Sequence, residues 1–200
     1  MNISFDLDST LIPNGKEFET ENRNGIAKLF GIEEIRKGTS ELVSDLQNQG
    51  HKIHIYTTSF RSKIKIRQTL RYYGIKVSRI VNEKENRQIL RSKNINSSKF
   101  PPAFDFDLHI DDLKGVEIES EKFNFKVIII EPTDNNWAEK IKNGIKTLGN
   151  NVYNSLLLIF LSENPRAELL PVIFTKLVAK PTQRNHTQYR YHTFEKIVTN

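Results

Sequence analysis

The chain has 200 residues, a hydrophobic content of 37% and a formal net charge of +6 at pH 7, which suits one domain with an appendage. It contains no cysteine, and this excludes disulfides, thiolate metal sites and a cysteine nucleophile. No secretory signal is visible and the longest apolar run, residues 156–161, is too short to cross a bilayer, so we expect a cytoplasmic protein with no membrane partner.

The first predicted strand, residues 3–5, is apolar and ends abruptly in Asp6-Leu7-Asp8-Ser9-Thr10. Two carboxylates two residues apart at the end of a strand can take different roles if the backbone turns between them. One of them can attack phosphorus while the other donates and accepts protons. An Asp-rich turn or a helix cap is the alternative interpretation, because Asp and Ser favour both places.

A small insert is expected next, at about residues 14–38. Pro13-Asn14-Gly15 predicts a turn, and a polar stretch with one apolar cluster then predicts a short helix that ends at Gly31. The following helix is expected to have Thr39 as its N-cap and to end before Gly50.

The second predicted strand, residues 52–56, ends at Thr57-Thr58-Ser59. A hydroxyl at this position can hydrogen-bond a phosphoryl oxygen, which makes Thr57 and Thr58 candidate phosphate-binding residues. Capping of the next helix is the simpler interpretation of these residues taken alone.

Residues 61–99 form a strongly basic segment, with twelve Lys and Arg against only Glu83 and Glu85. Such a segment attracts anions, whether phosphate esters, nucleic acid or an acidic protein, although a solvated basic helix face explains it equally well. It is predicted to hold a helix at residues 62–73, a third strand at residues 75–81 and a further helix at residues 83–92.

The fourth predicted strand, residues 107–110, leads into Asp111-Asp112. Adjacent acids at the end of a strand repel each other unless a cation or a basic group compensates them. Carboxylates with water and phosphate oxygens make the hard octahedral environment that Mg²⁺ prefers. A polar turn before Gly115 is the alternative. Lys99 can neutralise charge between the carboxylates and a phosphate, although taken alone it is one lysine among many.

A fifth strand at residues 127–130 and a helix at residues 136–148 complete the alternation of strands and helices, which predicts a parallel α/β sheet. The ligand site of such a sheet lies beyond the carboxyl ends of its strands, and the polar clusters follow strands one, two and four. We therefore predict a core at residues 1–148 and a C-terminal extension of uncertain structure at residues 149–200, with apolar stretches at residues 156–161 and 169–178.

Together these residues resemble the motifs of the haloacid dehalogenase superfamily of phosphatases and phosphotransferases. The stretch Phe5-Asp6-Leu7-Asp8-Ser9-Thr10-Leu11 is similar to its first motif, and Ile55-Tyr56-Thr57 to its second. Lys99 resembles the third motif, with Lys93 as a competitor and Lys84 as a more distant one. Leu108-His109-Ile110-Asp111-Asp112 resembles the fourth. The resemblance covers about residues 1–148 and is closest to a subgroup without a settled substrate.

The resemblance implies a Rossmann-like sheet of five parallel strands in the order 5-4-1-2-3, with helices on both faces. It implies that Asp6 forms an aspartyl-phosphate and that Asp8 acts as acid and base. Mg²⁺ would bind Asp6, the backbone carbonyl of Asp8, and Asp111 or Asp112, of which Asp112 is preferred. Thr57 and Lys99 would position and neutralise the remaining phosphate oxygens, which makes both of them catalytic residues.

The expected activity is therefore hydrolysis of a phosphate ester. The short interval between Pro13 and Thr39 resembles the capless or minimal-cap members of the superfamily, whose open sites admit bulky substrates. A phosphorylated small molecule, a nucleotide or a macromolecule would all suit the basic segment, and nucleic acid stays open as a partner. The alternative is a phosphate- or nucleic-acid-binding protein without turnover that uses residues 61–99. The sequence does not predict an oligomeric state.

Overall fold

The computed structural model describes residues 1–163 of the chain. The chain divides into two compact units, Met1–Gly149 and Asn150–Asn200. The first unit holds the sheet and its helices. Of the second unit, only the end of the last helix, α6 (Trp137–Glu163), is described. The boundary at residue 148 between a core and an extension stays a prediction.

The first unit is built on a sheet of five parallel strands in the order β3-β2-β1-β4-β5. This confirms the predicted α/β fold class and the expected strand order. The strands are β1 (Asn2–Phe5), β2 (Lys52–Tyr56), β3 (Arg79–Val81), β4 (Leu108–Asp111) and β5 (Val127–Ile129). All of them run in one direction, so their carboxyl ends meet at one edge.

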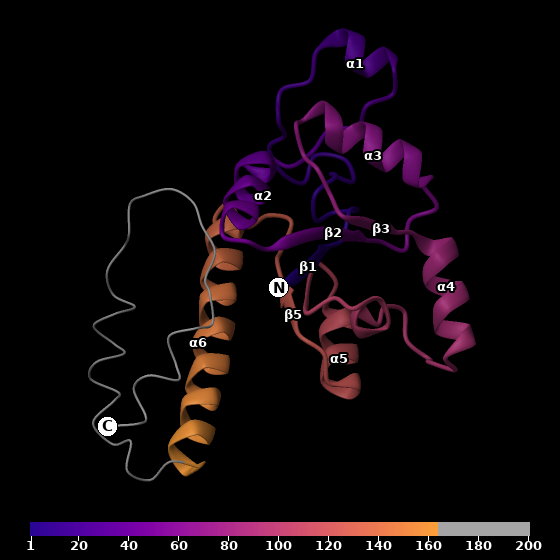
Figure 1. Ribbon diagram of the computed structural model, residues 1–200. Helices are drawn as coiled ribbons and strands as arrows, with labels where there is room; N and C mark the ends of the chain where they lie inside the picture. Colours follow the sequence, from indigo (N-terminus) through magenta and orange to yellow (C-terminus); the bar gives the residue numbers. More distant parts are fainter. Residues whose placement is uncertain (164–200) are drawn as a thin grey trace. The chain divides into compact units, whose positions relative to one another are not determined.

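Helices cover both faces of this sheet, and the alternation of side chains along the strands explains why. Ile3 and Phe5 of β1 join the larger apolar core, to which α2 (Thr39–Asn48), α3 (Lys63–Tyr72) and the first half of α6 contribute. A second core, formed by Tyr56, Val81, Phe104 and Phe106, lies apart from it. Figure 1 shows α2 and α3 on one side of the sheet, and α4 (Glu83–Ser92) and α5 (Lys114–Phe123) on the other.

The insert holds one short helix, α1 (Gly25–Leu29), and its two arms meet in an antiparallel bridge between Thr20 and Arg36. The Arg36 guanidinium is buried between the rings of Phe18 and Trp137, at 4.6 and 4.7 Å from their centroids. Its Nη2 donates to three backbone carbonyl oxygens of the loop that follows β5, those of Glu131, Pro132 and Asp134. The base of the insert is therefore fixed to the core by one buried cation.

Apart from shifts of one or two residues at the ends of elements, the structure differs from the predicted elements in four places, and it adds the helix α5, which was not predicted. Thr39 is the first residue of α2 and not its N-cap, because Gly38 takes the cap position with a left-handed φ of 84°. The third strand begins at Arg79 and not at residue 75, because the Ile75 N–H bonds back to Leu70 at the end of α3. A short 3₁₀ helix, Pro101–Phe104, lies where a loop was expected.

The fourth difference is the length of α6, which continues to Glu163, well beyond the predicted end at residue 148. The apolar stretch at residues 156–161 is part of this helix, and the stretch at residues 169–178 lies outside the described residues. No helix in the part of the chain that the structure describes is long and apolar enough to span a membrane.

Candidate active site

The two carboxylates of the first motif diverge because the backbone turns sharply after β1. Asp6 still belongs to the sheet, since its N–H donates to the Ile110 carbonyl at 2.9 Å, and its side chain is buried. The N–H groups of Leu11 and Ile12 then both bond to the Leu7 carbonyl, and Ser9 has a left-handed φ of 57°. Asp8 consequently lies on the outer side of the turn, with its side chain about half exposed.

Asp6 faces a buried lysine that also contacts the end of β4. Lys99 Nζ lies 2.8 Å from Asp6 Oδ1 and donates to Asp111 Oδ2 at 2.5 Å. His109 Nε2 donates to the same Asp111 oxygen at 2.9 Å, and the Leu113 N–H donates to Asp111 Oδ1 at 2.9 Å. Both oxygens of Asp111 are therefore occupied by protein donors.

Lys99 reaches this position because the loop before it is held from two sides. Glu119 of α5 accepts hydrogen bonds from the Ser98 N–H at 2.7 Å and from the Lys99 N–H at 3.3 Å. The Tyr56 hydroxyl accepts a bond from the Phe100 N–H at 2.8 Å. The two other lysines considered for the third motif, Lys93 and Lys84, are exposed residues at the end and at the start of α4. The geometry therefore favours Lys99.

Asp6, Asp111 and Asp112 form an acidic cluster in which one oxygen of each lies within 4.8 Å of the others. Asp112 also accepts a hydrogen bond from the Thr10 hydroxyl at 3.1 Å. Three carboxylates and the single ammonium of Lys99 leave a charge of −2 when all are ionised, which a divalent cation would cancel. Asp6 Oδ1 is buried, and apart from its ion pair with Lys99 it has no hydrogen-bond partner among the described residues. These hard oxygen donors fit a cation of the Mg²⁺ type.

The pKa values of the three carboxyl groups in the cluster shift in different directions. Burial raises the pKa of the Asp6 carboxyl, the charge of Lys99 opposes this, and Asp111 adds to the rise. Burial and the charges of Asp111 and Asp6 raise the pKa of Asp112 to about 6. Burial acts in the same direction on Asp111, but the hydrogen bond from His109 and the charge of Lys99 hold its pKa well below the usual range. Burial would lower the pKa of Lys99, yet Asp6 and Asp111 raise it, so the ammonium stays charged.

Asp8 is held by an arginine that the sequence did not single out. Arg61 Nη1 lies 2.6 Å from Asp8 Oδ1 and 2.7 Å from Ser59 Oγ, while Arg61 Nε lies 2.8 Å from Glu33 Oε1 of the insert. Burial lowers the pKa of the Arg61 guanidinium, but the hydrogen bonds to Glu33 and Asp8 outweigh this and raise it. The Asp8 carboxylate is not part of the acidic cluster; its ion pair instead ties the site to the insert.

The two threonines after β2 differ in their surroundings. Thr57 is buried, its N–H donates to the Val81 carbonyl at 3.0 Å, and its hydroxyl oxygen accepts a bond from the Ser59 N–H at 3.1 Å. Thr58 is partly exposed and lines a groove along α4. Since β2 pairs with β1, both threonines follow a strand that ends at the same edge as Asp6.

Three further residues take part in the site without having been predicted: His109, Thr10 and Arg61. His109 and Thr10 lie within the fourth and first motifs, and the spacing of His109 two residues before Asp111 places both side chains on one face of β4. Arg61 had no signal of its own, because it is one of twelve basic residues in its segment.

No family model and no curated protein matches the sequence. Among solved structures, the chain is similar to one chain of the Pnkp1/Rnl/Hen1 complex, with a TM-score of 0.42 and 17% identity over 64% of this chain, and it spans 45% of the length of that chain. It is also similar to a predicted phosphatase from Clostridium acetobutylicum, with a TM-score of 0.39 and 15% identity, over 76% of this chain and 98% of the other. At this level of similarity neither neighbour bears on the function.

Proposed function

We propose that the chain is a Mg²⁺-dependent phosphomonoesterase of the haloacid dehalogenase type. The observation that carries the proposal is the acidic cluster of Asp6, Asp111 and Asp112 around Lys99 at the carboxyl edge of the sheet. Buried acids of like charge are costly to the fold unless they serve a cation or a reaction. A phosphoryl group and a divalent cation together account for all four residues.

In the proposed reaction, Asp6 attacks phosphorus in line with the ester oxygen. The bond from phosphorus to that oxygen breaks as the bond to Asp6 forms, which gives an aspartyl-phosphate and an alcohol. Asp8 gives the leaving oxygen its proton and then takes a proton from the water that attacks the intermediate. Inorganic phosphate leaves and the Asp6 carboxylate is restored.

Asp6 and Asp112 are the proposed direct ligands of Mg²⁺, together with the backbone carbonyl of Asp8. The two oxygens of Asp111 are already engaged by Lys99, His109 and the Leu113 N–H, whereas Asp112 accepts only the bond from Thr10 among the described residues. A bound Mg²⁺ would screen the repulsion between Asp6 and the substrate and stabilise charge on the transferring group. Asp111 would not contact the ion directly and would instead hold Lys99 in position.

Lys99, Thr57 and Thr58 are the proposed contacts of the remaining phosphate oxygens. Lys99 offers a fixed positive charge in a buried position, where electrostatic stabilisation of the transferring group is strongest. Because Asp6 and Asp111 keep this lysine charged, it needs no proton change during the reaction.

The proposal is tested with Asp6→Asn, which should stay folded and lose turnover of p-nitrophenyl phosphate by a factor of about 10⁴ or more, because the amide is a poor nucleophile. Asp45→Asn, which removes an equal charge from α2 away from the edge, is the matched control and should keep full turnover. A quenched reaction of the wild type should show one added phosphoryl group on Asp6 by peptide mass spectrometry. Wild-type turnover by a folded Asp6→Asn protein, or full activity in excess chelator, would contradict the mechanism.

A further inference from the structure

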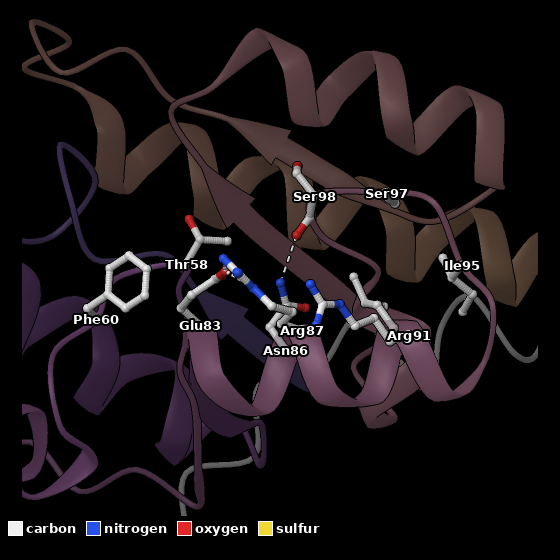
Figure 2. Close-up of a pocket in the computed structure, with 10 residues that line it drawn as sticks. Thr58, Phe60, Glu83, Asn86, Arg87, Arg91, Ile95, Ser97 and Ser98 are labelled. Atoms are coloured by element: carbon white, nitrogen blue, oxygen red, sulfur yellow. Dashed lines mark hydrogen bonds and ion pairs between the residues drawn. The ribbon is translucent and has the colours of Figure 1, made fainter.

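A groove of about 440 Å³ begins beside the candidate site and runs along α4. Thr58 and Ser98 line it, and they are the chain neighbours of Thr57 and Lys99. Figure 2 shows Phe60 and Thr58 toward one end of the groove and Ile95 at the other. An ester group that extends from a phosphate at the site therefore has a path along α4.

The outer side of α4 carries a stripe of cations. Lys84, Arg87 and Arg91 are spaced so that they share one helix face, and all three are exposed. Arg87 pairs with Glu83, while Lys84 and Arg91 make no ion pair with any residue up to Glu163. The stripe therefore keeps an excess positive charge. A second hollow of about 670 Å³ on the same stretch is lined by the whole stripe and by Phe60.

Phe60 supplies an aromatic surface directly before the basic segment of residues 61–99. The residue is 84% exposed, although it belongs to a loop directly after the buried strand β2. The tyrosines within the segment, Tyr72 and Tyr73, offer less free ring surface, because their rings pack edge to face with centroids 4.8 Å apart at the end of α3. A large apolar ring left in water beside two guanidinium groups suits a ligand with both a flat face and negative charge.

We propose that this groove binds a single strand of nucleic acid whose terminal phosphate is the group removed at the active site. A base near the phosphorylated end stacks on Phe60, and the following backbone phosphates pair with Arg87 and Arg91. These two arginines lie one helical turn apart, about 6 Å along the axis, which is comparable with the spacing of phosphates in an extended strand. The combination of a cationic groove and a stacking ring is the usual basis of single-strand binding. The inference rests on the proposed phosphatase function.

A phosphopeptide with acidic flanks would use the same arginines. It would leave the exposed face of Phe60 without a partner, and this observation favours nucleic acid. The acidic phosphopeptide is therefore the comparison ligand in the test.

The binding test uses the full-length Asp6→Asn protein, so that turnover does not interfere, and a short, labelled single strand with a terminal phosphate in DNA and RNA, 5′ and 3′ forms. Fluorescence anisotropy should show binding that weakens steeply with salt. Phe60→Ala should weaken it by about tenfold or more, the usual loss of one stacked base. When the logarithm of the binding constant is plotted against the logarithm of the salt concentration, Arg91→Gln should make the slope less steep by about 1. Arg67→Gln, an equal loss of charge on the exposed side of α3, is the matched control and should change neither quantity.

Measurements of turnover test strand binding in the groove separately from the proposed phosphatase activity. The wild type should show a higher kcat/KM for the phosphorylated strand than for p-nitrophenyl phosphate or a mononucleotide, and Phe60→Ala should narrow that ratio. Turnover of the small ester without strand binding, an equal effect of Arg67→Gln, or tighter binding of the phosphopeptide would overturn the groove assignment and leave the phosphatase standing. Strand binding through Phe60 and Arg91 without turnover of any ester would uphold the groove and overturn the phosphatase.

Discussion

Asp112 has the most readily tested charge of the acidic cluster. Its carboxylate form is disfavoured in the folded chain, because burial, Asp111 and Asp6 raise its pKa to about 6 from the usual value near 4. Because the pKa is higher in the folded than in the unfolded chain, the contribution of this group to the free energy of unfolding is greatest at low pH. It falls as pH rises from about 4 through about 6. A bound cation would reverse the penalty, since it favours the ionised form.

We therefore expect Asp112→Asn to be more stable than the wild type at pH 7.5 without Mg²⁺, and equal to it near pH 4. The pKa rise of about two units corresponds to about 3 kcal/mol, which solvent at this half-buried group reduces to about 1 kcal/mol. Added Mg²⁺ should stabilise the wild type but not the variant, by mass action. Urea denaturation at both pH values measures all three effects. A variant that is less stable than the wild type at pH 7.5 without metal would show that ionised Asp112 does not destabilise the folded chain.

Arg61 is the residue whose role follows most directly from distances. Its 2.6 Å contact with Asp8 and its 2.8 Å contact with Glu33 hold the proposed acid in one orientation between the sheet and the insert. We expect Arg61→Gln to lower kcat/KM for p-nitrophenyl phosphate by about tenfold or more, because a hydrogen bond to a charged group is worth about 1.5–3 kcal/mol. Arg61→Lys should restore little, since one ammonium does not reproduce the fork that bridges both carboxylates.

Lys65→Gln is the control for Arg61. Lys65 also contacts the insert, through the Gly31 carbonyl, but it has no hydrogen bond or ion pair to Asp8 in residues 1–163. Steady-state kinetics of the two variants show whether Arg61 acts by orienting Asp8 or by anchoring the insert. An equal loss in both would mean that anchoring of the insert, and not the orientation of Asp8, limits the reaction.

At the scale of elements, most strands were predictable because they are short runs rich in apolar residues that lead into polar residues. The rule that the carboxyl ends of parallel strands meet at one edge then brought Asp6, Thr57 and Asp111 to one place. The position of Lys99 was not predictable in the same way. It depends on contacts from Glu119 and Tyr56, which lie on other elements and leave no local pattern.

Neither the helix α5 nor the full length of α6 was predicted from the sequence. The helix α5 buries only Val116 and Ser120, while Ile118 is exposed, so its sequence has no apolar face to detect. The helix α6 crosses Gly149 without a break, although glycine is unfavourable within a helix. Where burial is slight, the sequence carries little information on the element.

The insert makes its own prediction at this scale. Arg36→Met should lower the free energy of unfolding by about 2–4 kcal/mol, because three partly buried carbonyl groups of the loop after β5 lose a charged donor. Lys37→Gln is the matched control, since its exposed pair with Glu19 contributes little. Denaturant unfolding measures both changes. A small effect of Arg36→Met would mean that water replaces the guanidinium and that the insert is not anchored there.

At the scale of the molecule, all proposed catalytic and binding residues lie in the unit Met1–Gly149. The residues that follow include two apolar stretches, at residues 156–161 and 169–178, and such stretches are rarely left in contact with water. They are therefore expected to contribute to stability or to association rather than to the chemistry.

We accordingly expect a fragment of residues 1–150 to keep phosphatase activity while it loses stability or changes its association state. The site supplies its own carboxylates, lysine and threonines, so removal of the later residues should change kcat/KM on p-nitrophenyl phosphate by less than about threefold, or about 0.6 kcal/mol. Calorimetry and light scattering of the fragment and the full chain measure stability and mass. A fragment that is folded and monodisperse but inactive would show that residues beyond 150 complete the active site, and the predicted division between core and extension would then be wrong.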